Sequence, residues 1–255
     1  MELKFNKEQE ERYKVLFGDC LIQLKTIQSN SVDAVITDPP YSSGGFSEAQ
    51  KMSAKSMGID SKRLKEMEWF PSDNMTTAGM IYLIRACCLE FDRVLKPNTS
   101  LLMFTDWRMV INLVPVIESC GFRFRNIIVW DKGSPGLGNG FRPTHEMIMH
   151  FVKGKSKFYS GKGSNVIREK RVTPKKRVHH TQKPTLLLKR LIEVVTDEGQ
   201  TVLDPFFGSG SVGEACMNMN RSVIGIEKSS IHYHTAKERL DNCDLEDKIS
   251  LFGSV

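Results

Sequence analysis

Short apolar runs alternate with longer segments of helical period along this chain. Runs rich in β-branched residues predict buried strands, because a strand covered on both faces needs no polar side. Apolar residues spaced three and four apart predict helices. The predicted strands cover residues 32–37, 100–106, 124–132, 145–153, 200–206 and 222–228. The predicted helices cover residues 80–98, 107–122 and 185–196, a stretch from Gly210 onward, and a stretch after residue 228 that reaches about Leu240.

The alternation of these elements predicts an α/β fold with a mainly parallel sheet. Pro97 is expected to end the helix 80–98, whereas the period of the helix 107–122 continues through Pro115. Two polar segments, 42–79 and 153–183, interrupt the alternation. Loops of this length inside a compact domain are usually functional or disordered.

Composition narrows the class of protein. A chain of 255 residues with 40% hydrophobic and 26% charged residues is typical of a soluble protein of one large or two small domains. The charged N-terminus carries no signal peptide, and no apolar run approaches the roughly 20 residues of a membrane helix. The six cysteines lack a C-x-x-C pairing, which predicts reduced thiols and argues against zinc, so no metal site is expected.

The segment 153–177 is basic, and Glu169 is its only acid. Together with a net charge of +6, this composition permits an anionic partner. Aromatic residues are sparse there, so phosphate contacts are favoured over base stacking, and a solvated loop is the alternative. The predicted phosphate-binding residues are Lys153, Lys155, Lys157, Lys162, Arg168, Lys170, Arg171, Lys175, Lys176 and Arg177.

The stretch "TVLDPFFGSGSVGEA" predicts a strand, a glycine-rich turn and the start of a helix. Gly208 and Gly210 would let backbone N–H groups approach a ligand, and Glu227 ends the next strand, where an acid can accept hydrogen bonds from ribose hydroxyls. The pattern therefore favours a nucleoside cofactor over a plain strand–helix turn. It lacks the lysine of a P-loop and the spacing G-x-G-x-x-G, which argues against ATP hydrolysis and an ordinary NAD site.

The stretch "DPPY", residues 38–41, also follows a predicted strand directly. Ligands of open α/β sheets bind outside the carboxyl ends of the strands, so we expect this stretch beside the glycine-rich turn. Asp38 is an acceptor when ionised, and Pro39 and Pro40 lack competing N–H groups. Tyr41 offers a flat face to a planar base. Acceptors that bind both hydrogens of an aromatic amine would free its lone pair for attack; a strand-ending turn is the alternative.

These motifs resemble those of the amino-methylating DNA methyltransferases that use S-adenosylmethionine. "DPPY" is similar to the catalytic motif of that family, and "DPFFGSG" to its cofactor motif. "HHTQKPTLLLKRLI", "GDCLIQLK" and "RPTHEMIMHFVK" resemble further family segments. The catalytic motif precedes the glycine motif, as in the β group. The resemblance implies a Rossmann-like seven-stranded methyltransferase sheet, mainly parallel with one antiparallel strand and helices on both faces.

The resemblance also implies roles for individual residues. Asp38, Pro39, Pro40 and Tyr41 would be catalytic or bind the target base. The target-recognition segment is short, so recognition is expected from loops at about 42–79 and 153–180 within a single catalytic domain, 1–255. Alone, Asp19 is typical of a turn acid before a helix, and Lys183 of a solvated surface charge. The implied cofactor residues are Asp19, Cys20, Asp38, Thr181, Gln182, Lys183, Pro184, Asp204, Pro205, Phe206, Gly208, Gly210, Glu227 and Lys228.

The favoured function is site-specific methylation of the N6 amine of a flipped adenine in double-stranded DNA. Cytosine N4 methylation is an alternative, because both bases carry an exocyclic amine; Asp rather than Ser at the head of "DPPY" favours adenine by resemblance. An RNA or protein amide methyltransferase and a catalytically silent DNA-binding module also stay open. The expected setting is the cytoplasm, near the nucleoid, of a prokaryote or phage host. A homodimer and a cognate restriction endonuclease are conceivable partners.

Overall fold

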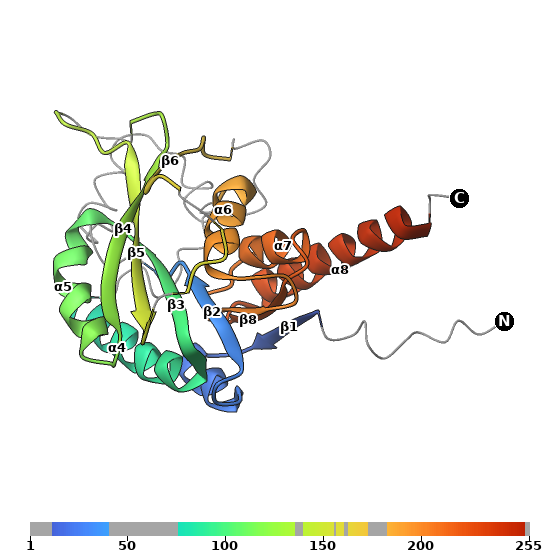
Figure 1. The fold of residues 1–255 in the computed structure, drawn as a ribbon, viewed down its shortest axis with the longest axis horizontal. Helices are drawn as coiled ribbons and strands as arrows, with labels where there is room; N and C mark the ends of the chain where they lie inside the picture. The colour runs from blue at the N-terminus through green and yellow to red at the C-terminus, as the bar shows by residue number, and fades with distance from the viewer. Residues whose placement is uncertain are drawn as a thin grey trace, which may run out of the picture.

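The computed structural model describes residues 12–40, 76–135, 140–155, 157–160, 163–172 and 183–252, with side chains up to residue 243. It has an eight-stranded sheet with helices on both faces (Figure 1). The strands are β1 (Tyr13–Phe17), β2 (Val32–Thr37), β3 (Leu95–Thr105), β4 (Arg123–Asp131), β5 (His145–Lys153), β6 (Val166–Arg168), β7 (Thr201–Asp204) and β8 (Ser222–Glu227). The helices are α1 (Cys20–Gln23), the 3₁₀ turn η2 (Leu24–Thr26), α4 (Thr77–Val94), α5 (Trp107–Glu118), α6 (Thr185–Val195), α7 (Ser211–Met217) and α8 (Ser230–Phe252).

The strand order is β1-β8-β7-β2-β3-β5-β4-β6. Strand β5 runs antiparallel to both of its neighbours, and every other pairing is parallel. The predicted fold class, with one antiparallel strand, is therefore confirmed. The described sheet has eight strands rather than seven, because three residues of the predicted basic loop, Val166–Arg168, pair with β4.

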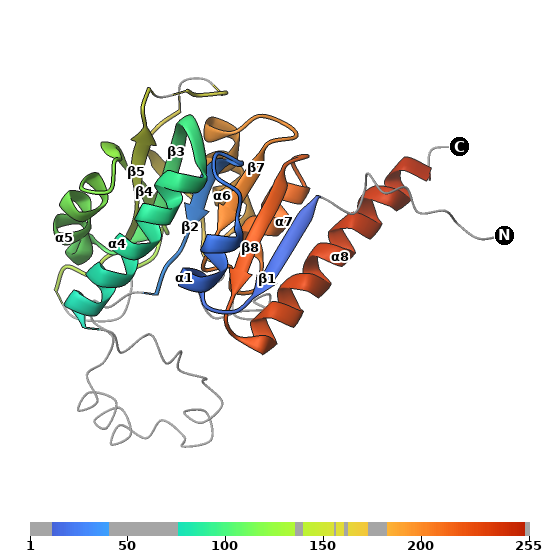
Figure 2. The ribbon, with the colours of Figure 1, turned by 90° about the horizontal axis from the view of Figure 1, so that it is seen from below.

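Each face of the sheet has its own core. Helices α1, α4 and α5 cover one face, around fully buried side chains such as Phe91 and Leu113. Helices α6, α7 and α8 cover the other face, around residues such as Leu188 and Ala215, and Figure 2 shows the two layers on either side of the sheet. Strand β2 lies between the layers, which explains why all six of its residues are buried.

Several predicted boundaries were wrong. Helix α4 ends at Val94, and Pro97 lies within strand β3, because a residue before proline favours extended backbone. Strand β1 was not predicted; it is a five-residue edge strand with no fully buried residue. Helix α8 continues to Phe252, past the predicted end at about Leu240.

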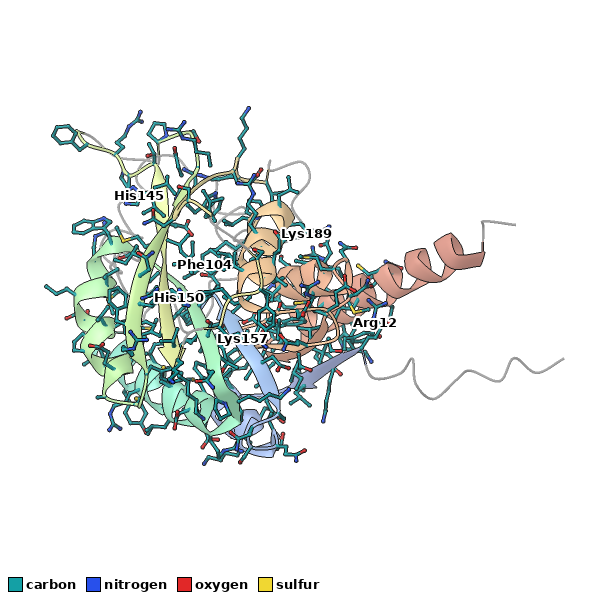
Figure 3. The ribbon with its side chains drawn as sticks, in the orientation of Figure 1. Arg12, Phe104, His145, His150, Lys157 and Lys189 are labelled. Carbon is teal, nitrogen blue, oxygen red and sulfur yellow. The ribbon has the colours of Figure 1, made fainter. Side chains whose placement is uncertain are left out.

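The directions of the strands bring many segments to one edge of the sheet. This edge holds the carboxyl ends of all parallel strands and the beginning of β5, which runs the other way. His145 marks this edge in Figure 3, and His150 lies nearer the middle of β5. The loops that could form a site therefore follow β1, β2, β3, β4, β6, β7 and β8, or precede β5.

Two features are absent from the part of the chain that the structure describes. None of the helices there has the length and apolar character needed to cross a membrane. Within the same residues, no group of three or more His, Cys, Asp or Glu side chains is arranged to hold a metal ion. All six cysteines are free thiols.

Candidate functional site

The glycine-rich turn after β7 lies at the carboxyl edge. Gly208 and Gly210 have φ angles of +52° and +79°, which favour glycine. A Cβ atom at Gly210 would lie 3.1 Å from the Cβ of Ala236, whereas one at Gly208 would meet nothing within 4 Å. The backbone at Gly208 therefore borders open space that a ligand can approach closely.

Phe207, which the sequence analysis did not assign, supports this turn from below. Its N–H donates to the carbonyl of Ile226 at 3.0 Å, and its ring is buried. The ring fills the space above two glycines: a Cβ at Gly213 would lie 2.6 Å from the Phe207 Cζ, and one at Gly225 would lie closer still. These glycines thus create the slot that fixes the turn.

Glu227, at the end of β8, is buried and holds the turn from the side. One carboxylate oxygen accepts the N–H of Gly208 at 2.7 Å, and the other accepts the N–H of Ser229 at 2.7 Å. The backbone carbonyl of Glu227 accepts the N–H of Gly18 at 2.9 Å, which brings the segment after β1 alongside. Each carboxylate oxygen keeps lone pairs that a ligand hydroxyl could use.

Of the predicted residues Asp19 and Cys20, only Asp19 has its side chain near the residues of the glycine-rich turn and Glu227. The Asp19 carboxylate caps α1 by accepting the N–H of Leu21, and it lies 3.5 Å from the exposed ammonium of Lys228. The thiol of Cys20 lies 3.9 Å from the thiol of Cys87 in the core, so only the backbone of Cys20 is placed at the edge.

Asp204 links the turn to the neighbouring strand β2. Its carboxylate accepts the Thr37 hydroxyl at 2.7 Å and the N–H of Phe206 at 3.1 Å. Burial raises the pKa of Asp204 to about 7. Thr37 immediately precedes Asp38, so this hydrogen bond fixes the distance between the glycine-rich turn and "DPPY".

Asp38 belongs to a chain of alternating charges that crosses the carboxyl edge. Its carboxylate lies 2.6 Å from the ammonium of Lys183, which lies 3.1 Å from Glu146, and Glu146 lies 3.1 Å from Lys132. The Lys183 ammonium also lies 5.0 Å from the centre of the Phe104 ring. The chain thereby joins the segments after β2 and β4, the start of β5 and the residue before the N-cap of α6.

Lys183 is not the solvated surface charge that its residue type alone would indicate, because only 9% of its side chain is exposed. Burial by itself lowers the pKa of Lys183, but the facing Asp38 and Glu146 carboxylates outweigh burial and raise it. Burial likewise raises the pKa of Glu146, and the two lysines reverse this and lower it. Lys183 and Glu146 are therefore held in their charged forms.

Sequence reasoning missed Glu146 and Lys132, although "RPTHEMIMHFVK" contains the former. Glu146 lies near the start of β5, the antiparallel strand. Sequence reasoning considered only residues that follow predicted strands, so it did not include Glu146. Three predicted site residues, Tyr41, Thr181 and Gln182, lie outside the described residues. Pro39 is buried beside Asp38, and Pro184 begins helix α6 directly after Lys183.

The predicted phosphate-binding residues divide between the two edges of the sheet. Lys153 ends β5 at the edge opposite Asp38, where it donates to the carbonyl of Leu95 at 2.9 Å; Lys155 and Lys157 follow it. Arg168 and Arg171 lie at the carboxyl edge, 3.3 Å from Asp131 and 3.1 Å from the Ser134 carbonyl, and the exposed Lys170 lies between them in the chain. Four further residues lie outside the described ranges: Lys162, Lys175, Lys176 and Arg177.

Comparisons with known proteins agree with this arrangement. A family model described as DNA methylase, the N6 and N4 type, matches residues 32–238. The type II methyltransferase M.HpaI of Haemophilus parainfluenzae is 29% identical over 255 residues, which cover 90% of this chain and 74% of that protein. The crystal structure of the M1.HpyAVI complex with S-adenosylmethionine has 26% identity and a TM-score of 0.65, over 90% of this chain and 99% of that one. The cytosine-N4-specific PvuII DNA methyltransferase has 15% identity and a TM-score of 0.69, over 90% and 88% of the chains, and shows likeness of fold.

Proposed function

We propose, since this chain belongs to the DNA methylase family and is an S-adenosylmethionine-dependent amino DNA methyltransferase, that it methylates the N6 amine of adenine at a specific site in double-stranded DNA. The observation that carries this proposal is the Asp38 carboxylate, paired with the Lys183 ammonium beside the glycine-rich turn. We also propose that residues 1–255 act as one catalytic domain.

The residues at the glycine-rich turn fit S-adenosylmethionine, the cofactor of this protein. When bound, it supplies an activated methyl group on a sulfonium centre. The open space at Gly208 admits a ligand close to the backbone, and the free lone pairs of Glu227 suit the two hydroxyls of a ribose. Phe206 is half-buried beside the turn, where its ring can contact an adenine face.

Asp38 would act on the target amine. Its carboxylate and the carbonyl of Pro39 would accept the two amine hydrogens, which weakens conjugation of the nitrogen lone pair with the ring and aims it at the methyl group. Lys183 would orient Asp38 through their ion pair. Alignment of the amine nitrogen, the methyl group and the sulfur can supply about 7–11 kcal/mol of catalysis. The base would have to leave the duplex stack, at a cost of a few kcal/mol, and Tyr41 could recover part of this by stacking.

Adenine and cytosine remain distinguishable by experiment. The Asp at the head of "DPPY" supports adenine by resemblance, and cytosine N4 is the alternative target. Purified protein should be incubated with S-adenosylmethionine and unmethylated DNA of high sequence complexity, and the DNA then digested to nucleosides for mass spectrometry. N6-methyladenine is expected. Detection of N4-methylcytosine would show that cytosine is the target base. Absence of any methylated nucleoside would favour a catalytically silent DNA-binding module.

Replacing Glu227 with Ala should weaken binding of S-adenosylmethionine by about 5- to 150-fold, which corresponds to about 1–3 kcal/mol for lost hydrogen bonds to a buried carboxylate. The affinity can be measured by calorimetry without DNA. Glu198→Ala is the matched control, because Glu198 is an exposed turn acid at the opposite edge. Equal affinities for wild type and Glu227→Ala would remove this carboxylate from the cofactor site.

Binding of duplex DNA should weaken steeply with salt, since each phosphate contact contributes about 0.9 to the slope of log affinity against log salt. We expect Arg168→Ala and Lys170→Ala each to reduce that slope by about 1, because both lie at the carboxyl edge. Lys155→Ala and Lys157→Ala, at the opposite edge, should change it little. The reverse pattern would place the DNA on the other edge of the sheet.

The proposal extends to partners and setting. The enzyme would meet DNA in the cytoplasm of a prokaryote or phage host, and a cognate restriction endonuclease would cleave the same site when it is unmethylated. Recognition of that site would involve loops at about 42–79 and 153–180. A homodimer is compatible with this scheme, and sedimentation velocity with and without DNA would determine the oligomeric state.

A further inference from the structure

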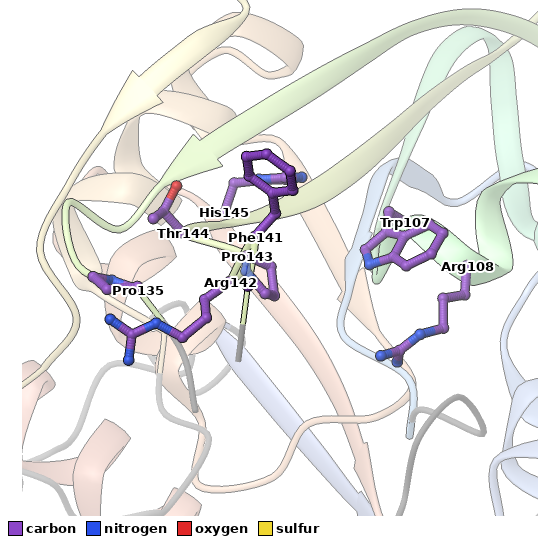
Figure 4. A pocket seen from close by; sticks show the side chains of 9 residues that line it. Trp107, Arg108, Pro135, Phe141, Arg142, Pro143, Thr144 and His145 are labelled. Carbon is purple, nitrogen blue, oxygen red and sulfur yellow. The ribbon is translucent and has the colours of Figure 1, made fainter. Parts of the chain in front are cut away.

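A cleft of about 750 Å³ lies at the carboxyl edge, between the start of α5 and the chain that leads into β5. Trp107 and Arg108 form one wall, and Phe141, Arg142 and His145 stand opposite (Figure 4). None of these residues belongs to the segments expected to bind DNA, and none contributes to the charge chain around Lys183.

The chemistry of the walls suits a nucleic acid strand. The described lining residues include two arginines and a histidine but no acid. Trp107 is 55% exposed and Phe141 is fully exposed, so two large aromatic faces are available at the opening. Guanidinium groups beside exposed aromatic rings match phosphates beside bases, since phosphates pair with arginine and bases stack on rings.

One wall of the cleft is held firmly. Asp106 caps α5 by accepting the N–H groups of Arg108 and Met109 at 2.8 and 3.3 Å. The same carboxylate lies 3.6 Å from the Arg108 guanidinium, which lies 5.3 Å from the centre of the Trp107 ring. The indole is therefore presented from a capped helix terminus rather than from a free loop, which favours a defined stacking position.

The cleft lies on the side of Asp38 away from the cofactor turn. Strand β3, which leads to Trp107, is the neighbour of β2 on one side, and β7, which leads to the glycine-rich turn, is the neighbour on the other. His145, on the far wall, adjoins Glu146, which contacts Lys183 and hence Asp38. A base at Asp38 with the cofactor over β7 would therefore have its own strand enter from the cleft.

We propose that this cleft binds the DNA strand next to the target base, with Arg108 and Arg142 at the phosphates and Trp107 and Phe141 against a neighbouring base. This inference rests on the proposed function and adds a place for the substrate strand that lies outside the two long loops. In this inference, Trp107 and Phe141 stabilise the distorted DNA after the target base has left the stack.

The test measures DNA binding and methyl transfer separately. The wild type is first assayed for methyl transfer, and sequencing of the methylated DNA identifies the site. A duplex with that site is then titrated, in the presence of S-adenosylhomocysteine, with wild type, Trp107→Ala, Arg142→Ala and the double variant. Arg123→Ala is the matched control, because Arg123 is exposed at the opposite edge. We expect the Kd for DNA to rise at least about 10-fold in the double variant, with cofactor affinity unchanged and no effect of Arg123→Ala.

A second readout tests stacking itself. The fluorescent base 2-aminopurine, placed in turn at positions beside the target, should be quenched at one position by wild type and not by Trp107→Ala. If wild type methylates DNA and the variants bind DNA and quench 2-aminopurine as wild type does, the role of the cleft in DNA binding is overturned. The proposed function is kept in that case. If wild type transfers no methyl group, the titration uses the unmethylated DNA of high sequence complexity instead. Binding that depends on the cleft residues would then keep the cleft and overturn the proposed function. A wild type that neither binds nor methylates DNA would overturn both.

Discussion

Replacing Asp38 with Ala should reduce methyl transfer by at least about 100-fold, or about 2.7 kcal/mol of barrier, with little change in cofactor affinity. The carboxylate lies beside the glycine-rich turn and 2.6 Å from the Lys183 ammonium, and we expect it to act on the target amine rather than on the cofactor. Without this acceptor, the nitrogen lone pair stays conjugated and poorly aimed. Single-turnover rates on a duplex with the identified site are the measurement.

The ion pair between Asp38 and Lys183 suggests Asp38→Asn as a control for this variant. Asp38→Asn keeps the shape and one acceptor but removes the charge that faces Lys183, so it should fall between wild type and Asp38→Ala. Circular dichroism and calorimetric cofactor binding would establish that each variant is folded. A wild-type rate for Asp38→Ala would mean that "DPPY" is only a turn.

Replacing Lys183 with Met should lower the free energy of unfolding by about 2–4 kcal/mol. Breaking a buried ion pair costs about 3–5 kcal/mol, and the 23% exposure of the Asp38 side chain reduces that figure. Lys132 still faces Glu146 in this variant, so Asp38 is the carboxylate that loses its Lys183 partner. A loss of this size corresponds to a fall in Tm of about 4–16 °C for a domain of this size, which calorimetry can detect.

A double variant separates charge from packing. Lys183→Met with Asp38→Asn removes both charges of the pair, so it should recover much of the stability lost in Lys183→Met while staying catalytically poor. Strictly additive losses in the two single variants would show that the pair has no coupling energy, and Lys183 would then be a packing residue only.

The fold was predictable where local pattern and tertiary structure agree. Strand β2, strand β5 and helix α6 match their predicted ranges closely, because an apolar run and an amphipathic period describe burial well. The glycine-rich turn and Glu227 were found because backbone freedom and a strand-ending acid are visible as residue types. Strand β1 was missed because it has only five residues, none of them fully buried, and follows a highly charged stretch.

The charge chain was not predictable from the same signals. Lys183, Glu146 and Lys132 are ordinary surface residues by type, and only the fold shows that they neutralise one another and Asp38 away from water. Phe207 is similar: its role depends on the two glycines beneath its ring, which come from α7 and β8. Such partnerships between distant segments carry no local pattern.

The pairing of β1 with β8 has a consequence for synthesis. The first and the last described strands are neighbours, with Tyr13 opposite Val223 and Phe17 opposite Glu227. At about 5–20 residues per second, a ribosome needs about 10–40 s between them, so β1 waits unpaired while the rest of the sheet is made. The N–H of Gly18 meets the carbonyl of Glu227 only after β8 has docked. Glu227, which we propose as a cofactor ligand, thus enters the sheet late, and a nascent chain cut short before β8 lacks that carboxylate.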